Sequence, residues 1–400
     1  MGDSVVFALP YMATTLVASP PAVRARDLSI DYLRTTLTLM VIAHQSSLAY
    51  TTSARFNKQH IFQSTAPVVD SARWIFFDYA ENFNDVFFMS LMFFVSGLFV
   101  YPALRRHGTW GFIRERLLRL GVPFVFAVVF LMPIAYYASW QLTGRSTGFV
   151  NFYKRLAQDR FAGGPEWFIW VLLAFGVALA LLLIPFQRCL PAAARYMAKL
   201  RNYPLAMFLT IFFIASVAYL PLLARYGFGA WTALFTSPFS FQIPRIGLYA
   251  MWFVFGFLAG TPGIDHGLLS REGPLARRWR LWMWACILAY NTLIFVPRIH
   301  PQPKLEAVLW VLSCVTSCFA FLAIFRGITL TSRAWMNSLA RSAYVMYLVH
   351  YVYLTWTQRI MLDLPIHAAL KFPFVFLSTT LLSWLTAQAL LRIPKLKSIL

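Results

Sequence analysis

Charged residues are scarce in this chain of 400 residues, and acidic residues are scarcer still. Only 12% of the residues are Asp, Glu, Lys or Arg, whereas 60% are hydrophobic and the mean hydropathy is +0.63. This composition does not fit the water-facing surface of a soluble protein, so it excludes a soluble enzyme. We therefore predict an integral membrane protein.

Cysteine is also rare, with only four residues in the chain. They form no CxxC pair and no disulfide framework, so we expect no metal site. Cys314 and Cys318 lie four residues apart in an apolar run and are expected to pack on one helix face.

The N-terminus lacks a basic residue before its first apolar stretch, and Pro10, Pro20 and Pro21 interrupt that stretch. It is therefore a poor signal peptide and too short to span a bilayer. We interpret residues 1–30 as a cytoplasmic N-terminal arm and residues 31–400 as one transmembrane domain.

Apolar runs of about twenty residues, bounded by charged clusters, predict an all-α polytopic fold with about ten transmembrane helices. The predicted ranges are 32–52, 82–104, 118–140, 166–187, 204–223, 244–261, 280–297, 305–326, 340–358 and 371–391. Segments 145–164 and 226–243 are not apolar enough to span and could be re-entrant or interfacial.

The net charge of +21, from 35 Lys and Arg against 14 Asp and Glu, is interpreted through membrane topology. An arrangement with both termini inside places most Lys and Arg in the inside segments, with the strongest cluster between the second and third predicted helices. We therefore expect the lipid bilayer, and no nucleic acid, as a partner.

Ionisable groups inside a span are costly, so each is a candidate functional residue. Asp31 and Arg34 lie at the start of the first predicted helix, and His44 and Gln45 follow about 15 Å deeper, near the middle of the bilayer. Asp31, Arg34, Thr38 and Gln45 share one helix face, and His44 lies at its edge. The alternative is an interfacial anchor pair and a histidine that bonds a neighbouring helix.

The predicted helix 340–358 contains a second histidine, His350, beside Tyr347 in a stripe of tyrosines that could equally be packing. In the second helix Asp85 lies near the outer end, and Ser96 with Gly97 permits close helix approach, with Ser96 read as packing. Glu166 and Trp167 follow a Gly-Gly-Pro turn, where Glu166 could transfer protons or, as we prefer, cap the helix.

Four segments together resemble the membrane acyltransferase 3 family over most of the chain. They are DYLRTTLTLMVIAHQSSLAY, FFMSLMFFVSGLFVYPALRRHGTWGFIRERLLRLGVPF, GPEWFIWVLLAF and SAYVMYLVHYVYL with the closing LLRIPKL. The second segment is the most specific. Within the family, the chain looks most like the branch without an extra hydrolase-like domain, which includes the protein that succinylates periplasmic glucans.

The resemblance implies ten helices in a bacterial inner membrane and transfer of an acyl group to a sugar or glycan hydroxyl. It makes Arg34 the arginine of the first helix, Arg116 and Arg119 the RxxR pair, and His350 the histidine of the YLVH segment. The family usually spaces its first-helix arginine and essential histidine as R-x10-H. Here Arg34 and His44 are spaced R-x9-H, and Gln45 occupies the expected histidine position.

If the resemblance holds, His44 or His350 takes the proton of the acceptor hydroxyl, Asp31 orients the histidine, and Arg34 neutralises the thioester oxygen or a donor phosphate. A π-bulge could rotate His44 onto the polar face. The donor is expected to be cytoplasmic acyl-coenzyme A, a substrate and not a bound cofactor. Its phosphates would meet the basic inner segment, which holds Arg105, Arg106, Arg114, Arg116 and Arg119.

The remaining substrate-binding candidates are Tyr347, Glu166, Trp167 and Asp85. Two other functions stay open. Because glutamine cannot act as a general base, the chain could be a non-catalytic homologue of acyltransferases. It could also be a transporter or flippase of an anionic or lipid-linked solute, although the two halves show no repeat of the kind usual in transporters.

Overall fold

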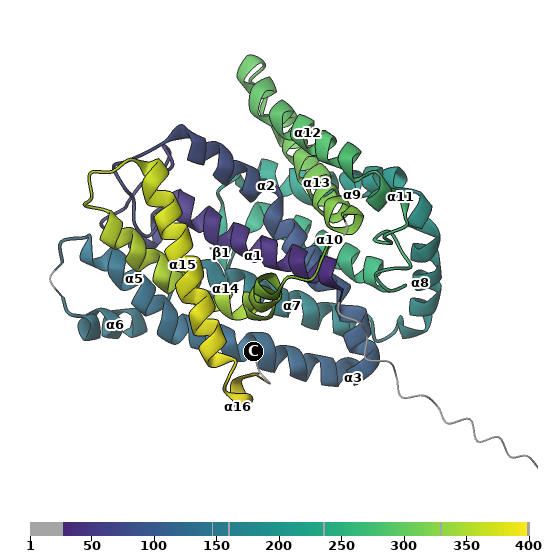
Figure 1. The fold of residues 1–400 in the computed structure, drawn as a ribbon, viewed down its shortest axis with the longest axis horizontal. Coiled ribbons are helices and arrows are strands. Elements are labelled where there is room, and N and C mark those ends of the chain that lie inside the picture. Colours follow the sequence, from purple (N-terminus) through teal and green to yellow (C-terminus); the bar gives the residue numbers. More distant parts are fainter. Residues whose placement is uncertain (1–26, 146, 159–160, 235–236, 329, 398–400) are drawn as a thin grey trace, which may run out of the picture.

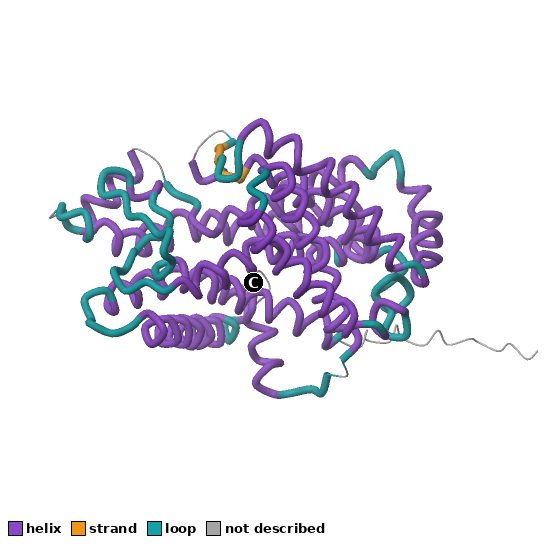
Figure 2. The backbone as a smooth tube through the Cα atoms, turned by 90° about the horizontal axis from the view of Figure 1, so that it is seen from above, coloured by secondary structure: helices purple, strands orange, loops and turns teal. Residues whose placement is uncertain are grey.

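The computed structural model describes residues 27–145, 147–158, 161–234, 237–328 and 330–397. Helices dominate this part of the chain, and the strands form a single short pair (Figure 2). Residues 1–26 of the predicted N-terminal arm lie outside the described ranges, and residues 28–30 belong to the first helix.

The helices of the first half, in chain order, are α1 (Leu28–Leu48), α2 (Ile75–Leu98), α3 (Val100–Arg116), α4 (Val122–Phe126), α5 (Met132–Gln141), α6 (Phe149–Gln158), α7 (Trp167–Leu182) and α8 (Leu190–Lys199). Those of the second half are α9 (Pro204–Tyr226), α10 (Ile243–Gly260), α11 (Pro274–Arg277), α12 (Trp279–Ile299), α13 (Pro303–Gly327), α14 (Ala334–Met361), α15 (Ala368–Leu390) and α16 (Pro394–Lys397). Strands β1 (Trp231–Ala233) and β2 (Ser240–Gln242) pair antiparallel between α9 and α10.

Within the described residues, a helical segment overlies each of the ten predicted ranges, and seven segments are long and apolar enough to cross a membrane. The chain is therefore a multi-pass membrane protein. The seven are 100–141, which joins α3, α4 and α5, and 164–182, α9, α10, α12, α13 and α15. Helices α1, α2 and α14 fall outside this set and carry most of the candidate site residues.

The segments 145–164 and 226–243 contain no such helix in their described residues. The first forms α6, which buries Phe152 and Leu156 against α5. The second forms the β1–β2 hairpin, whose Ser240 carbonyl accepts a hydrogen bond of 2.8 Å from the indole of Trp170. The hairpin therefore packs against α7.

A long bent rod runs from α3 to α5 and contains two π-helical turns, at Leu117–Gly121 and Ala127–Leu131. Each turn ends shortly before a proline, Pro123 or Pro133, whose ring cannot fit a regular helical turn. The carbonyl four residues before Pro123 belongs to Arg119, and it accepts a hydrogen bond of 2.7 Å from the Tyr344 hydroxyl. The bulge thus ties the rod to α14.

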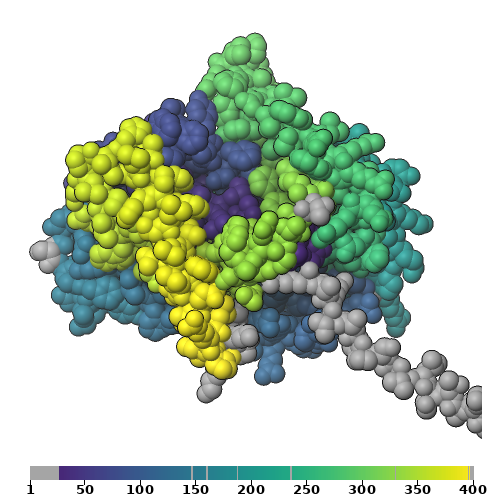
Figure 3. All heavy atoms as spheres, in the orientation of Figure 1, coloured from purple at the N-terminus to yellow at the C-terminus, as the bar shows by residue number. Residues whose placement is uncertain are grey.

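Helix α1 lies at the centre of the bundle and packs against α2, α13, α14 and α15 (Figure 1). Its first turns bond the start of α14, since the Tyr32 hydroxyl is 2.9 Å from Asn337 Oδ1. Its last turn bonds the end of α14, since Gln358 Nε2 is 3.3 Å from the Gln45 carbonyl oxygen. The two helices therefore run parallel, and Figure 3 shows α1 at the bottom of a hollow bordered by α14 and α15.

Helices α2 and α10 touch at their backbones. A Cβ atom added at Gly97 would meet the carbonyl oxygen of Phe253, and one added at Gly256 would meet that of Phe94. This confirms the close helix approach predicted at Ser96 and Gly97. The contact fixes the relative position of the two helices that carry Asp85 and Arg245.

A buried ion pair closes the end of the bundle where α1 ends. Lys371 Nζ on α15 is 2.6 Å from Asp70 Oδ2 in the loop before α2, and the two side chains are 1% and 2% exposed. Lys371 also donates to the carbonyl of Leu362 over 3.3 Å, and Asp70 Oδ1 accepts from the Ala72 amide over 2.8 Å. The loop between α1 and α2 is therefore fixed to α15.

Candidate active site

The His44 cluster consists of His44 on α1, Glu81 and Asp85 on α2, and Arg245 on α10. His44 Nε2 lies 3.9 Å from Glu81 Oε1, and its ring packs 5.1 Å from that of Phe88. The histidine Nδ1 is buried and has no hydrogen-bond partner among the described residues. A carboxylate thus faces one ring nitrogen, and the other is left unpaired by the described residues.

Arg245 holds Asp85 through two parallel hydrogen bonds. Its two terminal nitrogens lie 2.6 and 2.5 Å from the two carboxylate oxygens, and the guanidinium carbon lies 4.5 Å from the ring centre of Phe228 and 5.1 Å from that of Trp310. This forked geometry fixes the orientation of both groups and balances their charges. Glu81 remains as the carboxylate that faces His44.

The cluster is open on its carboxylate side. The side chains of Glu81 and Asp85 are 26% and 24% exposed, whereas that of His44 is 9% exposed. A solute can therefore reach the carboxylates while the imidazole stays in a largely dry environment, where electrostatic interactions are strong.

Three buried donors, one on Arg245 and two beside it, have no acceptor among the described residues. They are Arg245 Nε, Trp310 Nε1 and the Tyr219 hydroxyl. The rings of Tyr219 and Trp310 are stacked 4.6 Å apart, so the three groups belong to one patch. Buried polar groups are nearly always satisfied, so a patch of unpaired donors indicates a place for an acceptor that the chain itself does not supply.

A second buried group joins α14 to the start of α7. His350 Nδ1 lies 2.6 Å from the Tyr347 carbonyl oxygen, and because a carbonyl only accepts, Nδ1 carries the proton in the neutral ring. Its Nε2 is buried, and no residue that the structure describes bonds to it. The Tyr347 hydroxyl donates to the Pro165 carbonyl, which connects His350 to the turn that precedes Glu166.

The preferred interpretation of Glu166 as a helix cap is wrong. Glu166 is the residue before α7, but its side chain makes no capping hydrogen bond. Both carboxylate oxygens are instead buried and have no hydrogen-bond partner in the described part of the chain. Trp167 next to it is half-buried, with its ring 5.7 Å from that of Tyr249 and 5.6 Å from that of Trp231.

The structure does not bring Arg34 and Asp31 to His44. Helix α1 is a regular α-helix over Leu28–Leu48, so the π-bulge that could have rotated His44 is not there. Asp31 and Arg34 lie about 20 and 15 Å from His44 along the helix axis. They form their own contact of 3.8 Å, in which Arg34 is 49% exposed.

His44 lies in the last turn and a half of α1, which ends at Leu48. Gln45 is half-buried and lies about 100° further round the helix. His44, and not Gln45, is therefore the α1 side chain that contacts the acidic residues of α2.

Of the RxxR pair on the α3–α5 rod, Arg119 is exposed and Arg116 is half-buried. The Arg116 guanidinium packs over the Phe112 ring at 5.0 Å, and Arg119 Nε is 3.3 Å from Glu115 Oε1. Arg105, Arg106 and Arg114 are exposed on the same rod, near the end of α2. The segment is a basic surface, as its sequence predicts.

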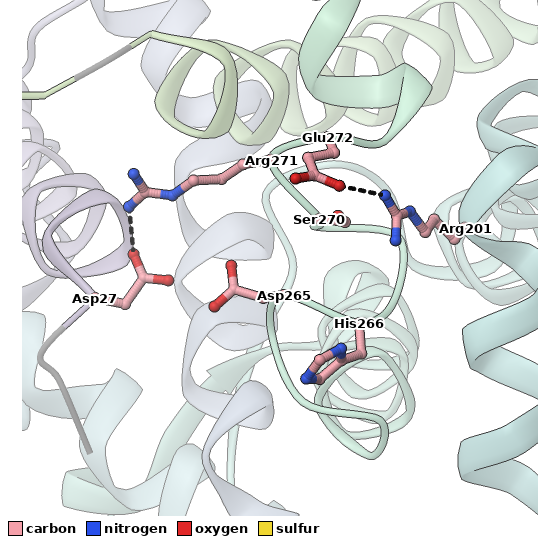
Figure 4. A pocket seen from close by; sticks show the side chains of 7 residues that line it. All are labelled: Asp27, Arg201, Asp265, His266, Ser270, Arg271 and Glu272. Atoms are coloured by element: carbon pink, nitrogen blue, oxygen red, sulfur yellow. Dashed lines mark hydrogen bonds and ion pairs between the residues drawn. The ribbon is translucent and has the colours of Figure 1, made fainter. Parts of the chain in front are cut away.

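A polar cavity of about 520 Å³ lies beside the start of α1 (Figure 4). Two ion pairs cross it, Arg271 with Asp27 and Arg201 with Glu272, each at 3.4 Å. Burial raises the pKa of Asp27, but the hydrogen bond from Ser29 and the charge of Arg326 outweigh it and lower the pKa below its ordinary value. The charges of this cavity are already paired, so it offers no unbalanced charge to a substrate.

Sequence reasoning missed Arg245 and gave Glu81 no role. Arg245 is the single charged residue of the predicted helix 244–261, which is the signal that could have found it. Glu81 lies one turn before Asp85 and shares its helix face, so the carboxylate could have been found from its spacing.

The comparisons with known proteins give one result. The family model described as "Acyltransferase domain" matches residues 27–388, which run from the residue before α1 to the last turn of α15. No curated protein and no solved structure gives a significant match.

Proposed function

We propose that this chain, which belongs to the acyltransferase 3 family of membrane acyltransferases, transfers an acyl group from acyl-coenzyme A to a hydroxyl group of a sugar or glycan. The observation that carries the proposal is the His44 cluster, in which a carboxylate faces one nitrogen of a buried histidine and an Asp85–Arg245 pair lies beside it. A bacterial inner membrane, with both termini in the cytoplasm, is part of the proposal.

His44 is the proposed general base. It takes the proton of the acceptor hydroxyl while the hydroxyl oxygen attacks the thioester carbonyl, and the carbon–sulfur bond then breaks. The same histidine returns the proton to the departing coenzyme A thiolate, so protons balance over the reaction. Glu81 replaces Asp31 as the group that orients the imidazole and stabilises its charged form. The separation of 3.9 Å is compatible with a contact that tightens when substrate binds.

The unpaired donors beside Arg245 are proposed to bind the oxygen that becomes negative during the attack. Fixed donors in a dry site stabilise such charge more than water does. The Asp85–Arg245 pair would set their position without changing protonation. Asp85, Glu166, Trp167 and Tyr347 remain proposed contacts of the acceptor.

The donor phosphates are proposed to lie at the other end of α1. Arg34 is half-exposed there, and the basic rod with Arg116 and Arg119 begins near the same end. Coenzyme A carries its phosphates at a distance from its thiol, joined by the pantetheine arm. The phosphates and the thioester can therefore be bound at different depths, as the separation of Arg34 from His44 requires.

The test measures coenzyme A release by the purified full-length protein from acetyl- and succinyl-coenzyme A, with and without a glucan oligosaccharide. We expect acceptor-dependent release that falls about 10²- to 10⁴-fold in His44→Ala. Glu81→Gln should reduce it less. His60→Ala, a histidine exposed in the loop between α1 and α2, is the matched control and should keep full activity.

Full activity of a folded His44→Ala protein would overturn the assignment of the base, and loss of activity in His350→Ala alone would move it to His350. Activity found only in Gln45→His would mean that the natural chain is a non-catalytic homologue. Acceptor-independent movement of solute across vesicles, with no coenzyme A release, would favour a transporter.

A further inference from the structure

An apolar groove runs between α9, α12 and α13 on the outside of the bundle, remote in sequence from the His44 cluster. Its volume is about 470 Å³, and its walls include Leu205, Phe208, Trp282, Leu288 and Leu312. One charged residue, Arg278, lines it at the end where α12 begins. We call this recess the α12 groove.

The polar groups along the α12 groove are satisfied by the chain itself. Thr292 donates its hydroxyl to the Leu288 carbonyl over 2.8 Å, and Thr316 donates to the Leu312 carbonyl over 2.7 Å. An occupant therefore does not need to form hydrogen bonds along the length of the groove. An occupant must be apolar over most of that length.

The end of the groove at Arg278 is positively charged. The Arg278 side chain is exposed and makes no hydrogen bond or ion pair within the described ranges. Arg277 lies beside it in the chain, and the first amide groups of α12 add positive potential at the same place. The groove thus combines an apolar length with a cationic end.

The length of the groove fits one leaflet of a bilayer. Arg278 and Thr292 are fourteen residues apart on α12, or about 21 Å along the helix axis. Half of the hydrocarbon core is about 15 Å thick, so the groove covers the depth of one leaflet and more. In the predicted orientation Arg278 lies at the cytoplasmic surface, where anionic lipids attract Lys and Arg.

We propose that the α12 groove is a binding site for an anionic glycerophospholipid, with its phosphate at Arg278 and an acyl chain along Phe208, Trp282 and Leu288. A free anion would leave the apolar length of the groove empty. A second copy of the chain would need a broad complementary face, of about 800 Å² per partner, and not a recess with charge at one end.

The experiment uses the full-length protein in detergent and counts bound lipid by native mass spectrometry. Phosphatidylglycerol and phosphatidylcholine with identical acyl chains are titrated into wild type, Arg278→Gln and the matched control Arg280→Gln. Arg280 lies two residues away with its guanidinium over the Trp279 ring, outside the groove. Circular dichroism confirms that each variant is folded.

We expect wild type to bind one phosphatidylglycerol at least about fivefold more tightly than phosphatidylcholine, the size of effect that one basic residue has near an anionic lipid surface. Arg278→Gln should lose this preference, and Arg280→Gln should keep it. Ala285→Phe, which narrows the groove without changing charge, should weaken binding of both lipids.

Equal binding of the two lipids by wild type would overturn the proposal. So would an equal loss in Arg280→Gln, which would indicate general surface charge. Complete competition by glycerol 3-phosphate would assign the site to a free anion. A dimer mass that disappears in Ala285→Phe would assign it to a second copy of the chain.

Discussion

The buried Asp70–Lys371 pair allows a quantitative prediction that needs no knowledge of the substrate. Lys371→Met removes one charge from a pair in which both side chains are at most 2% exposed. Breaking such a pair from one side costs about 3–5 kcal/mol, because the other charge stays buried without compensation. Asp70→Asn should cost a similar amount while keeping an acceptor for the Ala72 amide.

The double variant Asp70→Asn with Lys371→Met should be much less destabilised than the sum of the single variants. It leaves no charge behind, so we expect a coupling free energy of at least about 2 kcal/mol. The loss of the Lys371 contact with the Leu362 carbonyl remains and should cost about 1 kcal/mol.

The assay is reversible unfolding of the full-length protein in mixed micelles, followed by circular dichroism. Lys304→Met is the matched control, since Lys304 is exposed at the start of α13 and should change the free energy of unfolding by less than about 0.5 kcal/mol. Additive free-energy changes in the double variant, or a Lys371→Met effect no larger than that of Lys304→Met, would refute the reasoning.

Two further predictions use the same unfolding assay. Gly256→Ala should destabilise the protein by about 1–3 kcal/mol or more, because its new Cβ atom meets the Phe94 carbonyl oxygen; Gly148→Ala, which meets open space, should not, and equal effects would contradict the backbone contact. Asp27 has a lowered pKa in the folded protein, so its ionised form stabilises the fold above the unfolded pKa of about 4, and this stability is lost as the pH falls through the lower folded pKa. Asp27→Asn should remove that part of the pH dependence, and identical pH profiles for the two proteins would show that the pairing with Arg326 contributes nothing.

The positions of the long helices could be predicted from the sequence because a span needs only local information. Charge clusters and prolines mark its ends, and about twenty apolar residues define its length. The observed helix boundaries differ from the predicted ones where a helix begins with polar residues. Helix α2 begins at Ile75, whereas the predicted range begins at residue 82. The prediction is late because the first turns of the helix carry Asp78 and Glu81, which interrupt the apolar pattern.

The partners of the candidate residues could be predicted only in part. Helical spacing places Arg34 and His44 on different faces of α1, and the structure keeps them apart. The pairing of Asp85 with Arg245 joins residues 160 positions apart, and no local pattern encodes it. The burial of Glu166, whose side chain makes no capping hydrogen bond, is likewise not encoded by the residues around it in the sequence.

The glycine contacts between α2 and α10 have a mechanical consequence. Two helices whose backbones touch cannot rotate or slide past one another without collision, so Asp85 and Arg245 travel together as one rigid unit. Any movement that admits substrate to the His44 cluster must then come from the other elements around it, among them α1, which carries His44. This helix is hydrogen-bonded to α14 at both ends, through the Tyr32 hydroxyl and the Gln358 amide, so we expect α1 and α14 to move together.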